Sequence, residues 1–294
     1  MKDELFKYAK EIGIDLIGVC EFNQDDDLKI LDCENQINPF INKKRRSKFD
    51  ELESFKTAIV IGVAYPSSYE GLDETDIITS FSNSSWGMDY HGVLKSRLEE
   101  LADFIKRSET DFKYEIMVDT GPVNERYLGK MAGIGFKGKN NMLINPKFGS
   151  FFFIGVMLTD LEIEEDIPMD ISCKGCNKCV IACPTNSLKE RNSLKCVSYL
   201  TQKKELSEEE FKYINDLVFG CTICQEVCPH NKGINQKNDS FKPSGVEFIK
   251  KKDVFNLTNR EFKLKYGHLA GSFIGKKRLK RNLELIIVNN KSLQ

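Results

Sequence analysis

Eight of the ten cysteines fall in one short segment of this 294-residue chain, and their spacing constrains what the segment can fold into. The first four form the run Cys173-x2-Cys176-x2-Cys179-x3-Cys183-Pro184. In this pattern three thiolates bind three irons of one [4Fe–4S] cluster, and the fourth cysteine, before the proline, binds a second cluster. The spacing therefore predicts a ferredoxin-like module that holds two [4Fe–4S] clusters.

A second run, Cys221-x2-Cys224-x3-Cys228, also ends before a proline but is one cysteine shorter. Val218 stands where its first cysteine would be, and Cys196 is the remaining cysteine of the module, so we expect Cys196 to replace the missing ligand. Exchange of the two pre-proline cysteines between clusters then completes both ligand sets. The first cluster is assigned Cys173, Cys176, Cys179 and Cys228, and the second is assigned Cys183, Cys196, Cys221 and Cys224.

A pair of structural zinc sites is the alternative, because zinc is commonly held by two C-x2-C motifs with four ligands per site. The Cys-Pro endings and the crossed ligand count favour iron–sulfur clusters. Cys20 and Cys33 stand apart from the module, and we expect ordinary thiols there, since unpaired cysteines are commonly buried. The three histidines, His91, His230 and His268, are not spaced as a metal-binding pair.

The N-terminal residues 1–13 are amphipathic and charged, unlike the apolar stretch of a signal peptide. The longest apolar run, residues 151–158, is too short to span a bilayer. We therefore expect a cytoplasmic protein without a membrane partner. In that reducing compartment, clustered cysteines indicate metal binding or redox chemistry and not disulfide bonds. A monomer is expected.

The net charge of −1 gives no global attraction for nucleic acid, so an RNA partner would need a local basic patch. Residues 242–281 supply one, with twelve Lys and Arg against three Asp and Glu. The stretch 276–281 (KKRLKR) could grip phosphates. A solvated helix face is the alternative and the commoner meaning of such a charge run.

Helix and strand patterns alternate in residues 1–168 and predict a mixed α/β (α+β or α/β) domain. Helices are expected over 2–12, 89–107 and 123–132, and strands over 57–65, 114–118 and 151–158. Residues 169–232 form the cysteine module, in which Ser207 and Glu210 predict a capping box. Residues 233–294 are expected to form a basic helical tail. The glycine pattern at 133–138 matches a dinucleotide fingerprint, but it follows a helical stretch instead of a strand, which argues against that function.

Asp119 ends an expected strand and enters a Gly-Pro turn, where side chains often face a ligand. A carboxylic acid there could donate a proton if burial kept it protonated. The alternative is an Asx-turn residue that caps the next helix. The residues alone favour this structural role.

Several motifs, in order along nearly the whole chain, resemble those of epoxyqueuosine reductases, which are cobalamin-dependent iron–sulfur enzymes of queuosine synthesis in tRNA. The matching segments are 85–91 (SWGMDYH), 118–126 (VDTGPVNER), 135–140 (GFKGKN), 149–150 (GS), 196–201 (CVSYLT), 221–231 (CTICQEVCPHN) and 281–282 (RN).

The resemblance implies a cobalamin-binding domain at 1–168, similar to that of reductive dehalogenases, which the ferredoxin-like module supplies with electrons from an unidentified low-potential donor. It implies that the tail helps to hold the tRNA anticodon stem-loop and that this chain is a short form, without the HEAT-like repeats of many members. Asp119 would be the catalytic acid in the reduction of epoxyqueuosine to queuosine at the wobble position. The implied cobalamin contacts are Arg46, Asp119, Lys139, Asn140, Leu143, Ile154 and Ser198.

Two other functions stay open. A cobalamin-dependent reductase of a small molecule, like the reductive dehalogenases, would share the clusters and the cofactor. The basic tail and the lack of a twin-arginine signal favour tRNA over this alternative. A non-catalytic electron carrier would need neither the Asp119 signature nor the glycine-rich segment.

Overall fold

A computed structural model describes most of the chain, in two compact units. The described residues are 1–23, 49–67, 81–119, 121–214, 217–234, 239–241 and 249–291. The first unit comprises Met1–Ala64, His91–Asn177 and Pro229–Ile234, and the second comprises Tyr65–Tyr90, Lys178–Cys228 and Asn235–Gln294. Arg46 and Cys33 lie outside the described residues. The expected domain boundaries at 168 and 232 stay predictions.

The first unit is built on a four-stranded sheet with the order β1-β2-β6-β3. These strands are β1 (Leu16–Glu21), β2 (Thr57–Ala64), β6 (Phe152–Thr159) and β3 (Tyr114–Met117). The three pairings between them are antiparallel. All eight residues of β2 are buried. A strand in the middle of a sheet that is covered on both faces reads as a continuous apolar run, and this is why β2 could be expected from the sequence.

One face of this sheet is covered by two helices, α1 (Lys2–Glu11) and α4 (Tyr90–Ile105). The rings of Tyr8 and Phe104 stack with their centroids 4.6 Å apart and join the two helices. On the sheet, Gly155 leaves room for two leucines of α4, because a Cβ there would lie 3.0–3.2 Å from their methyl carbons. The leucines, isoleucine and alanine of α4 that face the sheet are fully buried, which stabilises the unit by about 1.5–3 kcal/mol for each large side chain.

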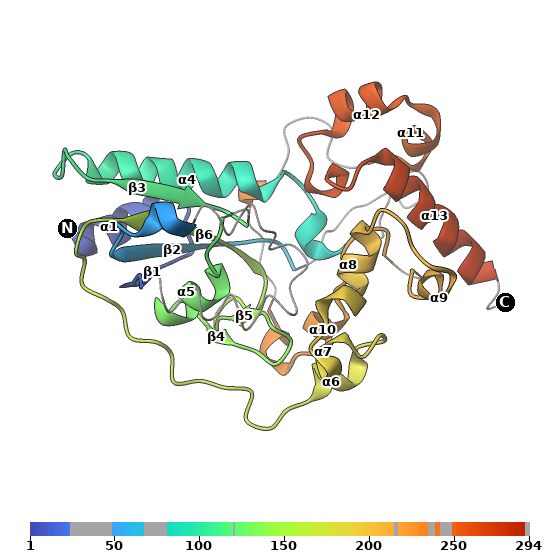
Figure 1. Cartoon of the computed structure of the whole chain (residues 1–294), viewed down its shortest axis with the longest axis horizontal. Helices are drawn as coiled ribbons and strands as arrows, with labels where there is room; N and C mark the ends of the chain where they lie inside the picture. Colours follow the sequence, from blue (N-terminus) through green and yellow to red (C-terminus); the bar gives the residue numbers. More distant parts are fainter. Residues whose placement is uncertain are drawn as a thin grey trace. The chain divides into compact units, whose positions relative to one another are not determined.

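Helix α5 (Glu125–Met131) lies on the opposite face of the sheet, as Figure 1 shows. Leu128 of this helix belongs to one apolar cluster with Val60 and Val156. The end of α5 comes so close to β1 that a Cβ on Gly18 would lie 2.0 Å from the carbonyl oxygen of Ala132. Glycine at this position therefore allows the helix and the edge strand to touch.

The six helices and strands expected in residues 1–168 are confirmed as α1, β2, α4, β3, α5 and β6. The sequence prediction missed β1 and the short antiparallel pair β4 (Phe136–Lys137) and β5 (Leu143–Ile144). The glycine pattern at 133–138 runs into β4 and not into a helix, so its rejection as a dinucleotide fingerprint is confirmed.

The second unit is helical. Its cysteine-bearing part contains α6 (Lys178–Ala182), α7 (Ser187–Glu190), η3 (Ser193–Lys195), α8 (Val197–Gln202), α9 (Glu208–Phe211) and α10 (Ile223–Glu226). Its tail contains α11 (Lys251–Asn256), α12 (Asn259–Tyr266) and α13 (Lys276–Lys291). Its short 3-10 turns also include η2 (Asn83–Ser85), η5 (Asp239–Phe241) and η6 (Ala270–Ser272), whereas η1 (Phe49–Leu52) and η4 (Pro229–Asn231) belong to the first unit.

The helical tail packs on an apolar core of its own unit. Tyr266 and Leu279 from the tail share this core with Trp86 and Val218. The capping box expected at Ser207 is confirmed at the start of α9. No helix within the described ranges is long and apolar enough to cross a membrane.

Candidate active site

The four cysteines assigned to the second cluster gather in the second unit. Burial, together with the neighbouring thiols of Cys196 and Cys183, raises the pKa of the Cys221 thiol to about 11. Burial and the thiols of Cys221, Cys196, Cys179 and Cys183 raise the pKa of the Cys224 thiol to about 12. Thiols that shift one another's pKa lie within electrostatic range of one another, and iron would have to displace their protons when it binds.

The loops that carry these cysteines are joined by one buried threonine. Cys196 is the N-cap residue of α8, and Thr201, one turn further along that helix, accepts a hydrogen bond from the N–H of Gly220 at 3.0 Å. Gly220 precedes Cys221 and has a φ of +83°. A Cβ there would lie 2.0 Å from Oγ of Ser82, so this turn requires glycine.

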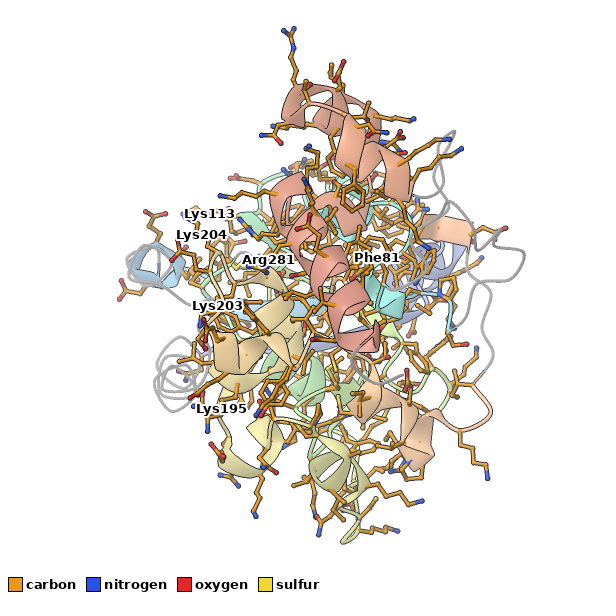
Figure 2. The ribbon with its side chains drawn as sticks, turned by 90° about the vertical axis from the view of Figure 1, so that its right-hand side faces the viewer. Phe81, Lys113, Lys195, Lys203, Lys204 and Arg281 are labelled. Carbon is orange, nitrogen blue, oxygen red and sulfur yellow. The ribbon has the colours of Figure 1, made fainter. Side chains whose placement is uncertain are left out.

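Two residues of α13 tie the tail to the same loops. Asn282 Nδ2 donates to the carbonyl oxygen of Thr201 at 2.9 Å and to that of Val218 at 2.7 Å. The guanidinium of Arg281 donates to the carbonyl oxygens of Lys203 and Lys204 at 2.8 and 3.0 Å, and Figure 2 labels these three residues. The expectation that Arg281 grips a phosphate is wrong for these donors, because they bind main-chain carbonyls of their own unit.

Val218 occupies the place of the missing cysteine in the second run. Its side chain is fully buried in the tail's apolar core. A cysteine there would face that core, and this explains in physical terms why the ligand has to come from elsewhere. Cys196 is a suitable candidate for the missing ligand, since its thiol helps to raise the pKa of the Cys221 and Cys224 thiols.

The cysteines assigned to the first cluster are divided between the two units. In the first unit, Cys176 N–H donates to the carbonyl oxygen of Cys173 at 2.8 Å. The N–H of Lys139 donates to Sγ of Cys173 at 3.4 Å, and its Nζ donates to Asn177 at 2.7 Å. Lys139 thus lies beside the first run of cysteines. Hydrogen bonds to the sulfur ligands of a cluster tune the cluster's reduction potential, and the N–H of Lys139 could do so through Cys173. In the second unit, Cys179 and Cys228 are buried. The ligand set of the first cluster stays a prediction.

Two motifs that are far apart in the sequence meet within the first unit. Asn231, which follows the second cysteine run, accepts from the N–H of Ser150 at 2.8 Å and donates to its Oγ at 2.9 Å. Gly149 has a φ of +58°, and a Cβ on it would lie 2.3 Å from Oδ1 of Asn231. The ring of His230 packs edge-on against Phe136. His230 therefore has a packing role.

Asp119 follows β3 in a conformation that is uncommon for a residue with a side chain. Its φ is +55°, in the left-handed region, where such residues cost about 1–2 kcal/mol and aspartate is among those that tolerate it. Its N–H donates to Oε1 of Glu125, the first residue of α5. Oδ2 of Asp119 lies 3.8 Å from Nε2 of His91, and the Asp119 side chain is 64% exposed. Outliers of this kind often mark functional sites.

The cap of the next helix is a different residue. Asn124 is the N-cap of α5, and its side chain accepts from the N–H of Tyr127 at 3.1 Å. The alternative in which Asp119 caps this helix is therefore wrong. An exposed carboxylate with an imidazole beside it can exchange a proton with a ligand above it.

The other predicted cobalamin contacts have varied surroundings. Leu143 is 3% exposed and packs in the same apolar cluster as Ile154, which is half-buried. Asn140 is buried, and its side chain accepts from the N–H of Met142 at 3.2 Å. Ser198 belongs to the second unit, where its carbonyl oxygen accepts from Oγ1 of Thr201 at 2.8 Å. Leu143 is thus nearly enclosed, whereas Ile154 keeps some exposed surface.

Comparisons with known proteins define the class first. Residues 172–231 match the family model described as a 4Fe-4S double cluster binding domain, which sets the zinc alternative aside. Residues 46–120 match the model described as epoxyqueuosine reductase QueG, DUF1730. The chain is thus an iron–sulfur oxidoreductase with a double-cluster domain.

A relative named epoxyqueuosine reductase, from Lactococcus garvieae, is 37% identical over 307 residues, which cover 98% of this chain and 87% of the relative. The chain belongs to the epoxyqueuosine reductase family, as its motifs predicted.

Solved structures agree with this assignment. A structure of epoxyqueuosine reductase with an epoxyqueuosine-modified stem loop of tRNA-Tyr has a TM-score of 0.86 at 35% identity, covering 98% of this chain and 81% of that chain. A structure of the Bacillus subtilis enzyme has a TM-score of 0.84 at 35% identity, with the same two coverages. In the latter, the loop of a catalytic aspartate is swung out of the active site.

Proposed function

We propose that this chain reduces epoxyqueuosine to queuosine at the wobble position of tRNA, with cobalamin as its reactive cofactor and two [4Fe–4S] clusters as the electron supply. The observation that carries the proposal is the turn at Asp119, where an exposed carboxylate in a left-handed conformation lies beside His91. Support also comes from relatives, since one binds a tRNA stem loop that carries epoxyqueuosine and another has a catalytic loop, named for an aspartate, that is swung out of the active site.

The conversion of an epoxide into an alkene takes up two electrons and two protons and releases the oxygen as water. When bound, reduced cobalamin would supply a strong reductant or nucleophile, and the cysteine-held clusters would supply its electrons. Asp119 would donate the first of these protons to the opening epoxide oxygen, and solvent would supply the second as the oxygen leaves as water. Its side chain is exposed in the chain alone, so bound cofactor and substrate would supply the burial that keeps the acid protonated. His91 would hold the carboxyl group toward the substrate.

Residues of the first unit fit cobalamin by their chemistry. The corrin ring has apolar faces, for which the half-buried Ile154 is suited, and an amide rim that can bond to main-chain groups of the loop that Asn140 holds in place through the N–H of Met142. Leu143 would support Ile154 from within the same apolar cluster, and Lys139 would link this site to the first run of cysteines. Arg46 and Ser198 complete the proposed contacts, as the family resemblance implies.

The clusters would use eight cysteines. The proposal keeps Cys173, Cys176, Cys179 and Cys228 for the first cluster, and Cys183, Cys196, Cys221 and Cys224 for the second. The electrostatic effect of Cys196 on both Cys221 and Cys224 supports its place in the second set.

The substitution Asp119→Asn tests the proposal. It keeps the size of the side chain and removes the acid, so turnover of epoxyqueuosine tRNA should fall by about 10²-fold or more, the usual worth of a positioned general acid. The absorption spectrum of bound cobalamin and the affinity for tRNA should stay as in the wild type. Asp111→Asn, an exposed aspartate in the loop before β3, is the matched control and should keep full turnover. Full turnover of Asp119→Asn with both cofactors loaded would overturn the acid role.

A further inference from the structure

The segment that carries the cysteines of α6 through η3 has an unusual surface. Residues 178–195 contain four Lys and Arg but one acidic residue. That acid, Glu190, pairs with Nζ of Lys195 at 2.5 Å. With Lys195 paired to Glu190, the positive charges of Lys178, Lys189 and Arg191, all exposed, have no acidic counterpart within the segment, and its net charge is +3.

Two aliphatic side chains are exposed among these charges. Ile181 on α6 is 82% exposed, and Leu194 on η3 is 49% exposed. Ile181 lies between Cys179 and Cys183 in the chain, and Leu194 comes two residues before Cys196. Single exposed apolar residues are ordinary, but these two accompany cysteines that are proposed to bind the clusters.

These elements form one local surface. Helix α6 contacts α7, and α7 contacts η3, so the segment folds back on itself. Figure 1 shows α6 and α7 as neighbours, and Figure 2 labels Lys195 at the end of the segment. We refer to Lys178, Ile181, Lys189, Arg191, Leu194 and Lys195 as the α6–η3 surface.

We propose that the α6–η3 surface docks an acidic one-electron carrier protein that reduces the clusters. This inference rests on the proposed function, in which the clusters must be refilled from outside the chain. Electron transfer slows steeply with distance, so a carrier has to dock beside cluster ligands. Opposite charges steer such a partner, and a small apolar centre inside a charged rim is typical of weak, short-lived redox contacts.

An RNA strand is the other partner that positive charge could attract. Binding of single-stranded nucleic acid usually adds aromatic side chains on which bases stack. The α6–η3 surface offers an isoleucine and a leucine instead. The position beside the cysteines and the aliphatic centre therefore favour a protein carrier over tRNA.

The test measures reduction of the clusters in the full chain, without tRNA, by stopped-flow mixing with a flavodoxin in its hydroquinone form. The variant Lys189→Glu/Arg191→Glu reverses two charges that are not adjacent to a cysteine. Its second-order rate constant should fall by about tenfold or more at low ionic strength, and the difference should shrink as salt is added. Ile181→Ser should slow reduction at low and high salt alike, and Ile181→Leu should restore the rate.

A matched control reverses two exposed charges of α12 in the same unit, Arg260→Glu/Lys263→Glu. It makes the same change in net charge and should reduce at nearly the wild-type rate. Reduction by dithionite, which needs no docking surface, should be equal in all variants and shows that the clusters are intact.

The proposal is wrong if flavodoxin reduces the Lys189→Glu/Arg191→Glu variant as fast as the wild type. It is also wrong if this variant loses affinity for tRNA while its reduction by flavodoxin is unchanged, since the surface would then bind RNA. Failure of the proposed function gives a different result. In that case wild-type protein driven by dithionite leaves epoxyqueuosine tRNA unchanged, whatever the reduction rates of the variants.

Discussion

The clamp made by Asn282 gives a prediction about stability. This side chain is fully buried, and its Nδ2 donates to the carbonyl oxygens of Thr201 and Val218, while its Oδ1 accepts from the guanidinium of Arg281 at 2.8 and 3.0 Å. Asn282→Ala leaves two buried carbonyls without this donor. Each buried polar group that loses its partner costs about 1–3 kcal/mol, so the free energy of unfolding should fall by roughly 2–5 kcal/mol.

Thermal unfolding of anaerobically prepared protein, followed by circular dichroism, measures this loss. At about 2–4 °C per kcal/mol for a chain of 150–250 residues, the Tm should drop by roughly 5 °C or more. Asn256→Ala, at the exposed end of α11, is the matched control and should change stability by less than about 0.5 kcal/mol. A Tm for Asn282→Ala within about 1 °C of the wild type would refute the reasoning, since buried carbonyls would then tolerate the loss of their donor.

Three further predictions concern single residues. Glu125→Ala removes the acceptor for the N–H of Asp119 and should lower kcat about tenfold or more with little change in KM, while Glu125→Gln, which keeps an acceptor oxygen, should restore most of the rate. Cys196→Ala should halve the iron content of the purified protein and remove the signal of one cluster in electron paramagnetic resonance, and an unchanged iron content would refute its ligand role. Burial acts to raise the pKa of the Asp253 carboxyl, but hydrogen bonds from Lys265 and the neighbouring tyrosine outweigh it and hold the pKa below its ordinary value. Its stabilisation should therefore be complete above about pH 4 and lost as the pH falls further, so acid titration of Asp253→Asn should show less loss of stability in that range than the wild type.

The first unit was predictable where the chain is apolar with a clear period. The buried run of β2 and the helical period of α4 each satisfy a simple pattern, and the structure confirms both. β1 escaped prediction because it is a short edge strand whose Gly18 reads as a strand breaker. Gly18 is needed for a tertiary contact of β1 with the end of α5, and no local sequence pattern records such a contact.

In the candidate site, too, features with a local sequence pattern could be predicted, and features that depend on tertiary contacts could not. Counting cysteines was enough to single out Cys196, because a cluster needs four ligands and Val218 cannot be one. The role of Asp119 could not be separated from that of a helix cap until Asn124 was seen to hold that place. The hydrogen bonds of Asn282 join residues 81 and 64 positions apart, and such contacts leave no trace in sequence periodicity.

Conversion of the modified nucleoside tests the central claim most directly. Anaerobic protein that holds both clusters and cobalamin is mixed with tRNA containing epoxyqueuosine and a low-potential reductant, and the digested tRNA is analysed by mass spectrometry. We predict that queuosine replaces epoxyqueuosine and that omission of cobalamin abolishes the conversion. Epoxyqueuosine that stays unchanged in the presence of fully loaded protein would contradict the proposed function.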